Sequence, residues 1–151
     1  KMAEGVKSGA VLKIPTVHWG RAKSKAKSWK ELLEKDPYSK TGLIGKEALI
    51  GLPPNEILQQ LFQKEFDRHE INWPVSVEVN STDVVRDFVV RGFGIGIGIF
   101  IPDQPNPKGV KPLVLPNFPP LVIGAMYQGK AKGVVEDFLT IAKAHVKKFS
   151  R

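Results

Sequence analysis

The clearest pattern of apolar and polar positions lies near the middle of the chain. Apolar and polar residues alternate over 75–79, which is the period of a half-buried strand. Residues 80–82 are short polar residues that can cap a helix start, and positions 84–89 then carry an apolar helical face. Gly92 can end this helix, and isoleucine recurs at every second position over 95–101. The pattern predicts a strand, a helix and a second strand, joined as one parallel βαβ unit.

Three glycines alternate with these isoleucines, at Gly94, Gly96 and Gly98. They leave one face of the second strand without side chains, so another part of the molecule must approach the backbone closely. We expect a neighbouring helix there, and direct contact with a ligand is the alternative. The dinucleotide fingerprint G-x-G-x-x-G is excluded because, counted from Gly92 or from Gly94, its third glycine is replaced by isoleucine.

A second strand and helix precede this unit. Residues 48–52 form a short apolar run, Pro53-Pro54-Asn55 follows, and apolar residues recur at helical spacing over 56–69. Alternating strands and helices are typical of a parallel sheet flanked by helices, so the fold class is α/β. The turns at 52–55 and 79–82 both deliver a helix start to the carboxyl edge of the sheet, where anions bind. The alternative is that each helix start is simply capped.

The flanking segments carry weaker patterns. Residues 1–27 are polar and weakly patterned, apart from a short predicted strand at 11–14, and a short helix is predicted at 29–35. After Pro102, most of the prolines of the chain indicate a connector without a long element.

The end of the chain predicts a strand over 121–127 and a closing helix from Gly133 onward. The apolar face of this helix has no obvious partner within the chain. We therefore expect it to belong to an incomplete second lobe and to drive association with another copy.

Composition narrows the chemistry. The chain of 151 residues has 42% hydrophobic residues and no cysteine, which suits one domain without disulfides or thiolate chemistry. His18, His69 and His145 are too scattered for a metal-ligand motif, so we expect neither a metal nor a cofactor. No apolar run is long enough to cross a bilayer and no export signal is apparent, so we expect a cytoplasmic protein.

The net charge of +8 is unevenly distributed. Residues 1–40 carry ten Lys and Arg against four Asp and Glu, whereas residues 41–128 carry seven against nine. The densest basic run, residues 21–30, lies beside Trp19 and Trp29. Basic residues with aromatic neighbours can grip a nucleic-acid strand, although a solvated loop is the simpler interpretation.

Catalysis has little support in the sequence. Ser81, His69 and Asp83 could form a hydrolytic triad on paper, but no nucleophile-elbow pattern surrounds any serine. We therefore expect that the protein is not an enzyme.

Two segments resemble one known family. NSTDVVRDFVVRGFGIGIGIFIP, residues 80–102, resembles the serine-capped helix, G-x-G-I strand and proline of the effector-binding domain of LysR-type transcriptional regulators. ALIGLPPNEILQQLF, residues 48–62, is similar to the strand and helix that open the second lobe of that domain. The resemblance implies a two-lobed fold like that of periplasmic solute-binding proteins. Here one lobe would be complete and the other partial.

The resemblance also implies a domain organisation and a function. Residues 1–30 would be a basic arm and lobe crossover, 31–101 the second, effector-binding lobe, and 102–151 the return segment, strand and C-terminal helix of the first lobe. The chain would sense a small, often anionic metabolite and self-associate, and DNA would be contacted only through a winged helix-turn-helix that these residues do not contain. The matching positions for effector binding are Pro53, Pro54, Asn55, Asn80 and Ser81. A basic nucleic-acid-binding protein that uses residues 21–30 and a solute-binding protein remain the alternatives.

Overall fold

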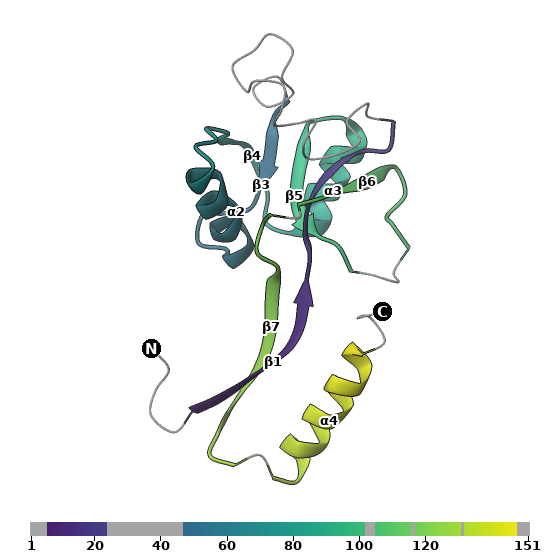
Figure 1. Cartoon of the computed structure of the whole chain (residues 1–151). Coiled ribbons are helices and arrows are strands. Elements are labelled where there is room, and N and C mark those ends of the chain that lie inside the picture. Colours follow the sequence, from purple (N-terminus) through teal and green to yellow (C-terminus); the bar gives the residue numbers. More distant parts are fainter. Residues whose placement is uncertain (1–5, 24–46, 102–104, 116, 131, 148–151) are drawn as a thin grey trace. The chain divides into compact units, whose positions relative to one another are not determined.

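The structure is a computed structural model, and it divides into two compact units (Figure 1). The larger unit comprises residues 15–100 and 105–119, and the smaller comprises 1–14, 101–104 and 120–151. The structure describes residues 6–23, 47–101, 105–115, 117–130 and 132–147.

The larger unit contains a five-stranded mixed sheet and two helices among the described residues. The strand order is β4-β3-β5-β2-β6. Its elements are β2 (Thr16–Arg21), β3 (Leu49–Gly51), α2 (Ile57–Arg68), β4 (Val75–Glu78), α3 (Thr82–Arg91), β5 (Ile95–Ile99) and β6 (Val110–Val114).

The centre of this sheet is parallel, as the sequence predicts. β3 pairs in parallel with β4 on one side and with β5 on the other. β2 pairs antiparallel with β5, and β6 pairs antiparallel with β2. The expected α/β class with a parallel core and flanking helices is therefore confirmed, and two antiparallel strands extend it.

The helices α2 and α3 cover opposite faces of the sheet. Neighbouring residues of a strand point to opposite faces. Gly96 of β5 lies against Val85 and Val89 of α3. His18, which pairs with the next residue of β5, lies against Phe62 and packs on the α2 side.

The sequence left open whether a neighbouring helix or a ligand covers the glycine face of β5, and the structure shows what lies there. A Cβ on Gly96 would collide with the Val85 side chain, and a Cβ on Gly98 would collide with the indole of Trp19. Side chains of the protein therefore fill the bare face of the strand. The expectation of a packed neighbouring helix is confirmed at Gly96, and at Gly98 the neighbour is an aromatic ring of β2.

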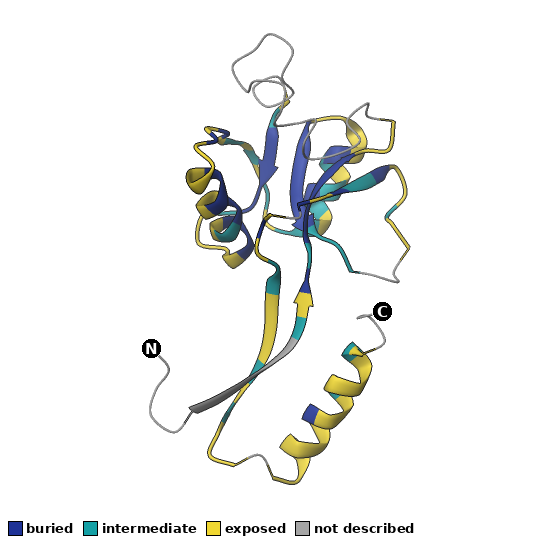
Figure 2. Ribbon diagram, in the orientation of Figure 1, coloured by how far each residue is buried: buried dark blue, intermediate teal, exposed yellow. Residues whose placement is uncertain are grey.

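An aromatic cluster forms the core on the α2 face. The rings of Phe62 and Phe66 of α2 lie 6.1 Å apart, and His18 lies 5.2 Å from Phe62 and 5.5 Å from Trp73. All four residues are buried. The strands of the larger unit are largely dark blue, the colour of buried residues, in Figure 2. Such ring pairs add stabilisation beyond the area that they bury.

Two expectations about loops are wrong. Residues 6–21, in which we expected one short strand, form β1 (Val6–Ile14) and β2. The proline-rich connector contains β6, whose Pro112 is tolerated because this strand lies at the edge of the sheet. The short helix expected at 29–35 lies outside the described residues.

The smaller unit consists of an antiparallel ribbon and one helix in the part that the structure describes. β1 pairs with β7 (Leu121–Gln128), with an irregularity between Ala10 and Leu12. α4 (Val134–Val146) follows, and Leu139 is its buried residue. The predicted strand and closing helix are both confirmed.

Candidate functional site

The two turns that carry the expected binding residues leave the sheet side by side. β3 and β4 are adjacent parallel strands, and Gly51 pairs with Glu78 where both strands end. The Val79 N–H donates to the Gly51 carbonyl at 3.0 Å. The turn after β3, which contains Pro53, Pro54 and Asn55, therefore starts beside the turn that contains Asn80 and Ser81.

The start of α2 has no side-chain cap. Its N-cap residue, Glu56, makes no side-chain hydrogen bond to the helix, and the first turn holds no acidic residue. The Pro53 carbonyl accepts from the Glu56 N–H at 2.9 Å, and the Pro54 carbonyl accepts from Gln60 Nε2 at 3.2 Å. Asn55 is exposed beside these groups. Because the first N–H groups of a helix lack helical partners, this end favours an anion, although the Glu56 carboxylate opposes one.

The start of α3 is capped instead. Ser81 is half-buried and its Oγ accepts from the Val84 N–H at 3.3 Å. Asp83 lies in the first turn and forms an ion pair with Arg86. The capping alternative is thus confirmed at Ser81. Asn80 is exposed just before it, and this helix start offers less to an anion than the start of α2.

The Ser81 cap gives a testable stability contribution. We expect Ser81→Ala to lower the free energy of unfolding by roughly 1 kcal/mol, because the Val84 N–H loses its acceptor. Urea denaturation followed by tryptophan fluorescence measures this loss. Ser76→Ala, at an exposed position of β4, is the matched control and should change stability by less than about 0.5 kcal/mol. Equal effects of the two substitutions would contradict the assignment.

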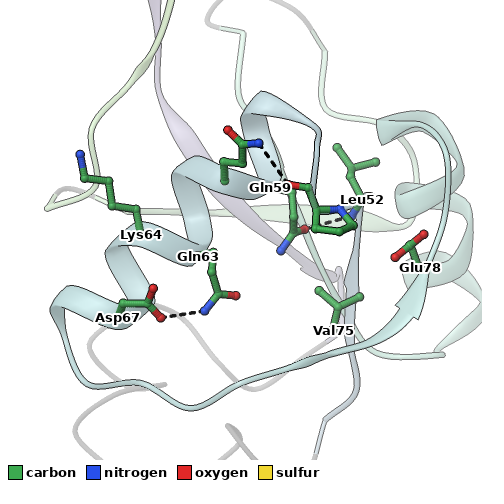
Figure 3. Close-up of a pocket in the computed structure, with 9 residues that line it drawn as sticks. Leu52, Gln59, Gln63, Lys64, Asp67, Val75 and Glu78 are labelled. Atoms are coloured by element: carbon green, nitrogen blue, oxygen red, sulfur yellow. Dashed lines mark hydrogen bonds between the residues drawn. The ribbon is translucent and has the colours of Figure 1, made fainter.

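A groove of about 460 Å³ lies between α2 and β4 (Figure 3). Of the five expected binding residues, Pro54 lines it and Pro53 does not, and Glu78 of β4 lines it as well. Asn55, Asn80 and Ser81 are not among its lining residues. The full lining is Leu52, Pro54, Gln59, Gln60, Gln63, Lys64, Asp67, Val75 and Glu78.

Gln59 is the lining residue that the sequence analysis missed. Its side chain is buried, and Oε1 accepts from the Leu52 N–H at 3.0 Å. This bond ties the end of β3 to α2 and leaves the amide nitrogen at the groove (Figure 3). A signal existed, because Gln59 interrupts the apolar helical spacing that includes Phe62 and Phe66.

Two residues that the alternative functions would use, nucleic-acid binding and hydrolysis, make contacts within the protein instead. Trp19, expected to support nucleic-acid binding, is only 3% exposed and packs in the core. Residues 24–30 of the basic run lie outside the described residues. His69, a member of the hypothetical hydrolytic triad, lies 3.9 Å from Glu65 and stacks on Phe118. Among the described residues, there is no group of three or more side chains that could hold a metal ion, and no helix long and apolar enough to span a bilayer.

Comparison with known proteins identifies the class to which this fold and its turns belong. The family model of the LysR substrate binding domain matches residues 31–147. The chain therefore belongs to the LysR substrate binding domain family. No curated protein matches the chain by sequence.

Solved structures share the fold at low identity. The CcmR regulatory domain of Synechocystis PCC6803, in complex with 2-PG, has a TM-score of 0.73 and 19% identity, over 97% of this chain and 71% of that chain. The effector binding domain of QuiR, in complex with shikimate, has a TM-score of 0.69 and 15% identity, over 98% of this chain and 70% of that chain. HinK, a LysR family transcriptional regulator from Pseudomonas aeruginosa, has a TM-score of 0.75 and 12% identity, over 99% of this chain and 51% of that chain. The chain thus spans about half the length of HinK.

Proposed function

We propose that this chain is the effector-sensing part of a LysR-type transcriptional regulator and binds a small anionic metabolite without transforming it. The match to the LysR substrate binding domain over residues 31–147 supports this proposal. The structures of CcmR with 2-PG and of QuiR with shikimate support small molecules as the ligand class. The regulator would work in the cytoplasm as an oligomer and contact DNA through a separate domain.

The uncapped start of α2 is the observation that carries the site proposal. Its free N–H groups lie beside the exposed Asn55, and the adjoining turn supplies Asn80 and Ser81. Backbone N–H groups would donate to the anion, and Asn55 would add a side-chain hydrogen bond. Pro53 and Pro54 would restrict the backbone conformation of the turn, which keeps these donors in place. Asn80 and Ser81 would take a secondary part, because the Ser81 oxygen already accepts from the Val84 N–H.

Charge substitutions at the start of α2 test this site. We expect Glu56→Gln to tighten the binding of an anion about threefold, because a repelling carboxylate is removed from the helix start. We expect Asn55→Asp to weaken binding about fivefold, because it adds such a charge. Asn72→Asp is the matched control, since Asn72 is exposed just before β4 and therefore lies at the opposite edge of the sheet.

The measurement is a thermal shift followed by calorimetric titration, with 2-PG, shikimate and acetate as probes. A ligand at a hundred times its dissociation constant stabilises the folded state by about 2.7 kcal/mol. If none of the probes raises the melting temperature, anion sensing by this chain loses its support. If Asn72→Asp weakens binding as much as Asn55→Asp, the anion does not lie at the start of α2.

A further inference from the structure

Gln59 is a buried polar side chain whose two ends differ in their hydrogen bonding. The residue is only 4% exposed. Its Oε1 accepts from the Leu52 N–H, and because a backbone N–H can only donate, the atom that faces it must be the amide oxygen. The amide nitrogen therefore points away from Leu52, and it donates to no residue that the structure describes. Buried polar groups are nearly always hydrogen-bonded, so these two N–H donors call for an acceptor from outside the chain.

The amide nitrogen of Gln59 faces the groove between α2 and β4 (Figure 3). Gly51 leaves room for this amide, because a Cβ there would lie 2.6 Å from Gln59 Oε1 and 2.7 Å from Val75 Cγ2. Turning the amide over would place its nitrogen against the Leu52 N–H, so its orientation is fixed. The groove volume of about 460 Å³ lies within the range of small-molecule sites. Gln59 thus presents fixed donors to a cavity of ligand size.

The groove also offers apolar surface to a ligand. Leu52 is buried at its lining, Val75 is half-buried and Pro54 is exposed. Small-molecule sites combine such apolar walls with a few fixed polar groups that orient the ligand. A ligand with an acceptor for the Gln59 amide should therefore also carry a short apolar part.

The charged residues of the groove favour a positive group on the ligand. Glu78 lines the groove and forms no ion pair with a residue that the structure describes. Lys64 and Asp67 line it as well, and their opposite charges cancel. The groove therefore has a net charge of one carboxylate. Glu78 pairs with the residue that precedes Leu52, which places it at the same end of the groove as the Gln59 amide.

We propose that this groove binds a small cation that also carries a carbonyl group, of which an amino-acid amide is the simplest kind. Gln59 Nε2 donates to the carbonyl oxygen, the Glu78 carboxylate accepts from the ammonium group, and the apolar part of the ligand lies on Leu52 and Val75. This ligand has the opposite charge to the anion proposed for the start of α2. The two proposals are independent, because a chain that binds no anion can still bind this cation.

NMR of the nitrogen-labelled full chain tests the groove with leucinamide as the probe. Its ammonium group, amide carbonyl and isobutyl group match the carboxylate, the donor and the apolar wall. Isocaproamide lacks the ammonium group and should bind about threefold more weakly, and isopentylamine lacks the amide and should bind about fivefold more weakly. The side-chain N–H signals of Gln59, identified by their loss in Gln59→Met, should shift with leucinamide. If leucinamide at millimolar concentration leaves these signals in place, the proposal is overturned.

A substitution of Glu78 tests the charge of the ligand without disturbing the core. Glu78 is exposed, so Glu78→Gln should fold normally, weaken leucinamide about threefold and leave isocaproamide unchanged. Asp87→Asn is the matched control, since it removes the same charge from an exposed position of α3, on the other face of the sheet. Equal loss of leucinamide binding in Glu78→Gln and Asp87→Asn would show that the cation does not lie in the groove.

Discussion

We expect Gly94→Ala to lower the free energy of unfolding of the larger unit by roughly 3 kcal/mol. A Cβ on Gly94 would collide with the carbonyl oxygen of Ala48, which is backbone and cannot turn away. The same oxygen accepts from the Ile95 N–H at 2.9 Å, so any shift that relieves the collision also lengthens this hydrogen bond. The φ of Gly94 is +156°, a value that side-chain-bearing residues rarely adopt.

Urea denaturation followed by tryptophan fluorescence measures this effect, because Trp19 and Trp73 are buried in the larger unit. Gly20→Ala is the matched control within the same sheet. A Cβ on Gly20 would lie 3.7 Å from Leu113 Cδ1, an ordinary van der Waals distance, so we expect a change of less than about 1 kcal/mol. Similar midpoints for the two variants would show that the Ala48 carbonyl is not a rigid neighbour.

The elements from β3 to β5 could be predicted because their signals are local. The cap at Ser81 and the stop at Gly92, whose φ is 87°, fix both ends of α3 within the sequence itself. The neighbouring strands were marked by alternation or by short apolar runs. The parallel pairing of β3 with β4 and β5 then followed from the order of strands and helices.

The strands β2 and β6 could not be predicted because their partners are distant. β2 is buried along almost its whole length, so its sequence shows no alternation of apolar and polar residues. It is a strand because it lies between β5 and β6, which are about 80 and 95 residues away along the chain. Pro112 argued against a strand, and only the edge position of β6 permits one there.

The sequence predicted that the two turns leave the same edge of the sheet, but it did not predict which hydrogen-bonding groups in them are already paired. Sequence order and strand adjacency place Asn55 and Ser81 in neighbouring turns. Which side-chain oxygen already has a donor is a matter of geometry, and it distinguishes the capped start of α3 from the uncapped start of α2. The role of Gln59 required the structure too, since its hydrogen bond to Leu52 depends on how α2 packs against β3.

His18 should make the larger unit sensitive to acid. The imidazole is fully buried among aromatic rings, and this burial lowers its pKa from 6.5 to about 3, which outweighs the opposing effect of a hydrogen bond with the Gly96 backbone. Between these two values the unfolded chain binds a proton at this residue and the folded chain does not. Acidification therefore favours unfolding, with a loss of roughly 1 kcal/mol for each pH unit from about pH 6.5 downward.

Urea denaturation at a series of pH values from 7.5 to 4 reveals this dependence as a falling midpoint. His18→Phe and His18→Leu both remove the proton-binding group while keeping an apolar side chain in the aromatic cluster. Their absolute stabilities will differ, but each should lose the part of the pH slope that His18 causes, and their two slopes should agree. Above about pH 7 the wild-type midpoint should be flat with respect to this residue, since the imidazole is neutral in both states. A wild-type slope below pH 6 that both variants retain in full would show that the buried imidazole is not the cause.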